Sequence, residues 1–224
     1  MLSKSLQEMK NTKISKVLIC LLLLFISTFL FSGCAYNVAV KRDKPISFQE
    51  REEKLQLNVG LYLSDEVKKH IIKAKGPIGG GYNFLIGEAL EANAIESLKK
   101  IFHEVFVIRD KTNISPYIER IISIEISPAS HFVLGATTLS KKTSKVELSC
   151  EIYDNKWNLL WKGSSIGKVN RTTGGAGVTP ALIGIFGVAI QQRALGDIVD
   201  ESLVLALEQL NEKILTDGRK QIME

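Results

Sequence analysis

The sequence is poor in the residues that build metal centres and catalytic sites. Its 224 residues include only three histidines, His70, His103 and His131, and none lies within helical or hairpin spacing of another. Metal sites need ligands clustered at defined spacings, so these histidines predict no metal site. The sequence also lacks a serine, histidine and aspartate order or a pair of carboxylates typical of catalysis. We therefore expect no metal, no cofactor, no catalytic residue and no enzymatic activity.

Long apolar runs are scarce too, and the clearest one stands near the start. Residues 17–31 form an apolar run of 15 residues, interrupted by Ser27 and Thr28 and preceded by four lysines and one acid. A helix needs about 20 apolar residues to cross a bilayer, so this run is short for a membrane span. A basic start, a short apolar core and small residues after it are typical of a secretory signal peptide, which we predict over residues 1–33.

The residues that follow, Phe31-Ser32-Gly33-Cys34, resemble the lipobox of bacterial lipoproteins, with Phe31 where that pattern prefers leucine. The resemblance implies cleavage between Gly33 and Cys34, attachment of diacylglycerol to the Cys34 thiol and acylation of the new amine. Two or three such chains hold a protein firmly on a membrane. The alternative is an uncleaved N-terminal anchor in which Cys34 is incidental.

The residue after the cysteine bears on location. Enterobacterial lipoproteins with aspartate there stay in the inner membrane, and Ala35 resembles the outer-membrane address instead. We therefore expect a protein anchored on the outer membrane by its lipid and facing the periplasm.

Cleavage also changes the charge and the cysteine count. Residues 1–33 carry four lysines and one glutamate, so their removal lowers the formal net charge from +5 to +2. The basic character thus belongs largely to the signal, and we expect no nucleic-acid partner. Cys20 leaves with the signal and Cys34 carries the lipid, which excludes an intramolecular disulfide. Cys150 remains, on the apolar face of a predicted strand, and is expected in the core.

The mature part is predicted to be one α+β domain on a tether. Residues 34–53 are polar and charged with little periodicity, which indicates a tether; residues 54–217 suit a single domain, and 218–224 form a tail. Within the domain, the patterns predict strands over 55–63, 105–108 and 118–126 and a hairpin over 145–169. Residues 131–142 are less regular and are interpreted as an edge strand or a loop. The predicted helices are a short one after Ser64 that stops before Gly76, one over 87–103 and one over 191–215. This order predicts an antiparallel or mixed sheet of about four to five strands with helices packed on one face.

One segment, residues 174–190, is rich in glycine and alanine and strongly apolar from Val178. Its apolar stretch is too short to span a bilayer as a helix. We interpret it as a contact surface for lipid or a partner protein, with packing over the domain's own sheet as the alternative. The residues predicted to make this contact are Val178, Leu182, Ile183, Ile185 and Phe186.

Three stretches give the mature part its wider resemblance: LNVGLYLSDE, GEALEANAIESLKKIF, and the late hairpin followed by a helix. They resemble, in general architecture, small outer-membrane lipoproteins of the envelope, including the lipopolysaccharide-transport lipoprotein. The resemblance implies a non-enzymatic lipoprotein that binds a protein partner in an envelope complex. A lipid or small-molecule carrier with an apolar groove between sheet and helices is the second hypothesis, and a hydrolase whose site the sequence hides is the third.

Overall fold

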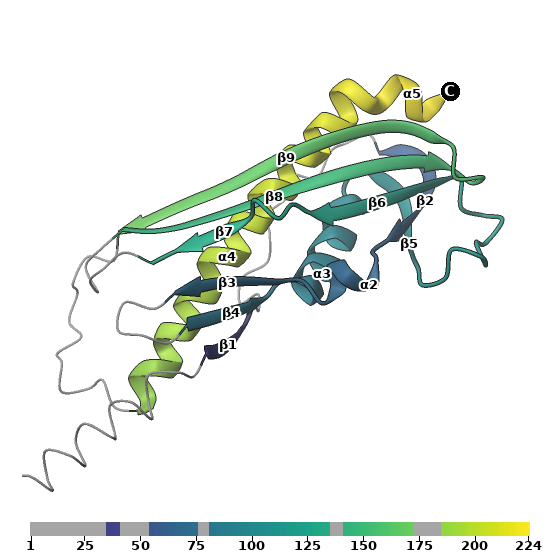
Figure 1. Cartoon of the computed structure of the whole chain (residues 1–224). Helices are drawn as coiled ribbons and strands as arrows, with labels where there is room; N and C mark the ends of the chain where they lie inside the picture. Colours follow the sequence, from purple (N-terminus) through teal and green to yellow (C-terminus); the bar gives the residue numbers. More distant parts are fainter. Residues whose placement is uncertain (1–34, 41–53, 76–80, 135–140, 173–184) are drawn as a thin grey trace, which may run out of the picture.

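The computed structural model describes residues 35–40, 54–75, 81–134, 141–172 and 185–224, with the backbone alone for 185–191. This part of the chain contains nine strands in two sheets, with a long helix running alongside both of them (Figure 1). The predicted α+β class is confirmed. The prediction of four to five strands is wrong, mainly because a second sheet was missed; residues 131–142, expected to hold an edge strand or a loop, contain β7.

The larger sheet has six strands and is mixed. Its strands are β2 (Leu55–Tyr62), β5 (Phe102–Ile108), β6 (Arg120–Ile126), β7 (His131–Val133), β8 (Lys141–Asp154) and β9 (Leu159–Thr172). β2 pairs in parallel with β5 and β6, whereas β6, β7 and β9 all pair antiparallel with β8. The alternating leucines and valine of β2 are buried, as their pattern predicts. The predicted hairpin is also confirmed, and its strands are longer than expected.

The smaller sheet has the strand order β1-β4-β3, formed by β1 (Ala35–Ala39), β4 (Gly81–Leu85) and β3 (Ile71–Lys75). β1 is parallel to β4, and β3 is antiparallel to it. The rings of Phe84 in β4 and Phe132 in β7 lie 4.8 Å apart between their centroids, so the two sheets share one core.

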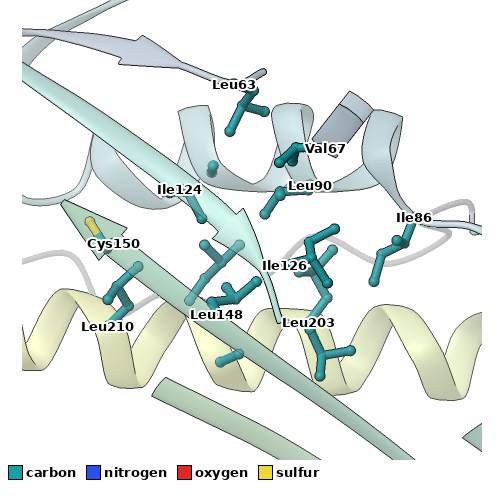
Figure 2. Close-up of a cluster of buried hydrophobic side chains, with 14 of the residues drawn as sticks. Leu63, Val67, Ile86, Leu90, Ile124, Ile126, Leu148, Cys150, Leu203 and Leu210 are labelled. Atoms are coloured by element: carbon teal, nitrogen blue, oxygen red, sulfur yellow. The ribbon is translucent and has the colours of Figure 1, made fainter. Parts of the chain in front are cut away.

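The helices are α2 (Asp65–Lys68), α3 (Gly87–Leu98), α4 (Ile185–Lys213) and α5 (Arg219–Met223), with a π-helical turn at Ile214–Gly218. Figure 2 shows side chains of α3, α4, β6 and β8 gathered in one apolar cluster, among them Leu90, Ile124, Leu148 and Leu203. Ser64 caps α2, because its hydroxyl oxygen accepts a hydrogen bond from the Val67 amide at 3.3 Å. Among the described helices, none combines the length and the apolar character needed to cross a membrane.

Three segments differ from the sequence-based expectation. Residues 71–75, expected to continue the short helix, form β3, because alternate burial of Ile72 and Ala74 favours a strand once a core is available. Residues 35–39, expected in the tether, form β1, and Val38 and Val40 are buried. The expected tail is packed: Ile222 is buried, and the Arg120 Nε donates to its carbonyl oxygen at 2.7 Å.

Candidate functional site

Most of the residues predicted to carry function lie outside the described part of the chain. These are Gly33, Cys34, Val178, Leu182 and Ile183. Ile185 and Phe186 open α4, and there the backbone alone is described. The lipid on Cys34 and the proposed contact of the apolar segment therefore stay predictions. The structure does describe the strand that directly follows Cys34 and the sheet to which that strand belongs.

The first described residue of the chain already belongs to a strand of the smaller sheet. Ala35 is the first residue of β1 and lies opposite Gly81, which in turn lies opposite Lys75. Consecutive Cα atoms are about 3.8 Å apart across a trans peptide. Any group carried by Cys34 is therefore joined to the corner of the smaller sheet through a single peptide bond, with no intervening linker.

β1 is held in place from several directions. Val38 lies opposite Phe84 and is buried in the main core. A Cβ placed on Gly196 of α4 would lie 3.0 Å from the Ala39 carbonyl oxygen, so the helix backbone passes close to the strand. The Asn83 Nδ2 also donates to the Asn37 Oδ1 at 3.1 Å. Pairing, packing and helix contact together fix the strand that follows Cys34.

The outward side of the smaller sheet forms what we call the anchor face. Residues directly opposite one another in paired strands point to the same side, and alternate residues point to opposite sides. Alternate burial along β3 and β4 separates this side from the buried row that contains Phe84. The anchor face consists of Ala35, Asn37 and Ala39 from β1, Gly81, Asn83 and Leu85 from β4, and Ile71, Lys73 and Lys75 from β3. It carries two lysines and no acidic residue.

The cysteine and the three histidines that were considered for catalysis or metal binding lie in separate parts of the fold. The Cys150 side chain is fully buried, and burial raises the pKa of its thiol, which disfavours the reactive thiolate. His70, His103 and His131 lie after α2, in β5 and in β7. Within the described ranges, no three or more histidine, cysteine, aspartate or glutamate side chains gather in a way that could hold a metal ion.

Buried polar pairs position α4 against its neighbours. The Asn211 Nδ2 donates to the Ser97 hydroxyl at 2.7 Å, and the hydroxyls of Ser144 and Ser202 lie 2.6 Å apart. Each of these groups finds its hydrogen-bond partner inside the core, so the pairs fix the helix against its neighbours. Sequence analysis missed them, and the signal available was polar residues in an otherwise apolar helix stripe.

A second feature that sequence analysis missed is an aromatic cluster on the other side of the larger sheet. Tyr62, Tyr153 and Trp157 pack edge-on or tilted at centroid distances of 5.4 and 5.8 Å. The Lys111 Nζ lies 4.6 Å from the Tyr62 ring centroid and 5.0 Å from that of Trp157. The ammonium group of this lysine covers two of the rings, and the cluster thereby packs the hairpin turn against β2.

Among the strands that the structure describes, β5 forms one edge of the larger sheet. Among the described strands, only β2 pairs with β5. Phe106 and Val107 lie on this strand, and each is 38% exposed. An edge strand with exposed apolar side chains is a ready template for pairing with another strand. Figure 1 shows β5 at the opposite end of the molecule from β1.

Comparisons with known proteins leave the family open. No protein-family model matches the chain, and no curated protein matches it. A Xanthomonas campestris protein of family DUF330 is 12% identical, with 86% of this chain and 98% of that one covered at a TM-score of 0.46. A candidate lipoprotein from Caulobacter crescentus is 9% identical, with coverage of 73% and 91% and a TM-score of 0.43. A minor lipoprotein from Acinetobacter baumannii is 14% identical, with coverage of 74% and 96% and a TM-score of 0.41. Scores this low carry no argument about function.

Proposed function

We propose that this chain is a cell-envelope lipoprotein, held by a lipid on Cys34, that binds an envelope protein without catalysing a reaction. Its anchor places it on the outer membrane, facing the periplasm. The observation that carries the proposal is the position of Ala35 in β1. The predicted signal peptide and lipobox are followed immediately by a strand of the folded domain. This order suits a domain that a lipid holds directly at the membrane, without a flexible linker.

The open edge of β5 is the described surface best suited to a protein partner. The backbone groups on the side of β5 that faces away from β2 can extend the sheet by one strand, and Phe106 and Val107 can pack against the incoming side chains. Because β5 and β1 lie at opposite ends of the molecule, membrane attachment leaves this edge accessible (Figure 1).

The interior bears on the carrier hypothesis. The side chains of Leu148, Leu203 and Leu210, which lie between the larger sheet and α4, are fully buried (Figure 2). These side chains belong to one apolar cluster that the sheet and the helix share. Their contacts are with the protein's own core, which favours partner binding over carriage.

Two measurements in cells test the proposal. Metabolic labelling with a palmitate analogue should mark the wild type and not Cys34→Ala. A photo-crosslinking aromatic residue at Phe106 should give a discrete adduct with an envelope protein, whereas the same residue at Tyr117, an aromatic position that is 74% exposed and off the edge, should not. Absence of label on Cys34 would refute the anchor. Equal adducts from both positions, or none from Phe106, would refute the partner-binding edge.

A further inference from the structure

We infer that the anchor face rests on the phospholipid headgroups of the membrane that holds the anchor, so that the lipid on Cys34 fixes the orientation of the domain. This inference rests on the proposed lipidation of Cys34. It adds a second membrane contact, made by the folded domain itself, through residues of three strands that are far apart in the sequence.

Geometry carries the first step. Ala35 is a corner of the anchor face, and Cys34 is its covalent neighbour. Strands advance about 3.3 Å per residue and lie about 4.8 Å apart, so the opposite corner, Ile71, is within roughly 20 Å of the attachment point. A face this close to its own lipid, on a strand fixed by pairing and packing, meets the headgroup layer when the domain tilts onto it.

Chemistry carries the second step. Lys73 and Lys75 project from β3 on the anchor face, which holds no acidic residue to oppose them. Lysines beside a membrane are attracted by anionic headgroups, and their long stems let the ammonium groups reach phosphates. The face therefore carries the charge that complements an anionic phospholipid surface.

The far row of the face is apolar. Ile71, Leu85 and Ala39 lie opposite one another across the three strands, and Ile71 and Leu85 remain 38% and 40% exposed. Apolar residues beside lysines suit the boundary between headgroups and acyl chains. The two rows that carry lysines complement the charge of anionic headgroups, and the apolar row is better accommodated at the headgroup–acyl boundary than in water.

Site-specific fluorescence on the lipidated protein tests this orientation. Lipidation consumes the Cys34 thiol and Cys150 is buried, so a cysteine introduced by Ile71→Cys can be labelled alone with bimane. Asn155→Cys, in the exposed hairpin turn, provides the control. Each protein is incorporated into phosphatidylethanolamine–phosphatidylglycerol vesicles that contain a headgroup nitroxide lipid. Quenching at position 71 and not at 155 is the expected result.

Charge variants test the role of the lysines. Lys73→Gln with Lys75→Gln should lower the ratio of docked to undocked protein, read from quenching at position 71, by roughly 25-fold, about fivefold for each lysine. Lys156→Gln, in the hairpin turn, is the matched control and should leave the ratio unchanged. Equal effects of the two changes would overturn the assignment of the lysines.

The outcomes separate this inference from the lipidation on which it rests. Intact mass without diacylglycerol and acyl chains on Cys34 would refute the anchor itself. Correct mass with no nitroxide quenching at position 71 would leave the anchor standing and overturn the membrane-facing orientation. Shielding of position 71 from iodide that grows with protein density, without nitroxide quenching, would assign the face to a second copy of the chain and also overturn it.

Discussion

The substitution Val38→Ala distinguishes a docked strand from a tether. Val38 is 3% exposed within β1, in a segment whose sequence predicts a tether. The change removes two buried methyl-sized groups at about 0.8 kcal/mol each, which gives roughly 1.6 kcal/mol from transfer alone. Incomplete closure of the cavity raises the loss to about 2 kcal/mol or more. In a tether the same change would cost almost nothing.

Thermal unfolding of the mature protein, followed by circular dichroism, measures this loss. For a chain of this length each kcal/mol shifts Tm by about 2–4 °C, so Val38→Ala should lower Tm by roughly 4–8 °C. Two controls use the same chemical change. Val59→Ala removes a fully buried valine of β2, and Val133→Ala truncates a valine of β7 that is 51% exposed.

The comparison among the three variants decides the outcome. If β1 is docked, Val38→Ala should resemble Val59→Ala and exceed Val133→Ala, whose effect should stay within about 0.5 kcal/mol. If Val38→Ala instead resembles Val133→Ala, β1 is not part of the core in solution. The direct mounting of the lipid on the sheet would then be wrong, along with the orientation that depends on it.

Two further predictions concern the helix contact and pH. A Cβ on Gly167 of β9 would overlap the Ser202 carbonyl oxygen and lie 2.6 Å from the Ala206 amide nitrogen, so Gly167→Ala should lower the urea midpoint by an amount equivalent to about 1–3 kcal/mol. The exposed neighbour Lys168→Ala should change it little, and equal midpoints would refute the close approach of α4 to β9. Burial lowers the pKa of His70 below its ordinary 6.5, so the folded state binds that proton less readily than the unfolded state. The contribution of His70 to the free energy of unfolding is therefore complete above its unfolded pKa of about 6.5, and it is lost as the pH falls through its lower pKa in the folded state. His70→Gln should flatten this dependence in urea titrations at several pH values; an unchanged slope would exclude His70 as its source.

Strong local periodicity explains what could be predicted from the sequence. The alternating apolar residues of β2 and of the β8–β9 hairpin, and the apolar stripe of α4, repeat over long stretches. Such patterns are stabilised by the same burial that creates the core, so local sequence and tertiary structure agree. The lipobox around Cys34 is a linear motif that needs no tertiary structure to recognise, and lipidation there stays a prediction.

The smaller sheet could not be predicted because its strands are short and their stabilisation is distant. Each strand has five residues, and β1 offers only one buried apolar side chain, Val38, within a polar setting. What makes β1 a strand is its pairing with β4 and its contact with α4, which follows about 150 residues later. The anchor face has the same origin. It combines three segments, and no single segment contains a pattern that would identify it.

The difference between a tether and a strand matters for how a partner is met. If residues 34–53 were a flexible tether, the root-mean-square distance between its ends would be roughly 25 Å, and the domain could rotate freely. With Ala35 already paired to Gly81, a lipid on Cys34 leaves the domain little of that freedom. Binding a partner normally costs the free energy of lost rotation and translation, and an anchored, oriented domain has already lost part of both. If the proposed anchor and the proposed partner-binding edge are both correct, a rigid attachment would strengthen binding at the β5 edge without any additional contact there, and it would favour partners held on the same membrane.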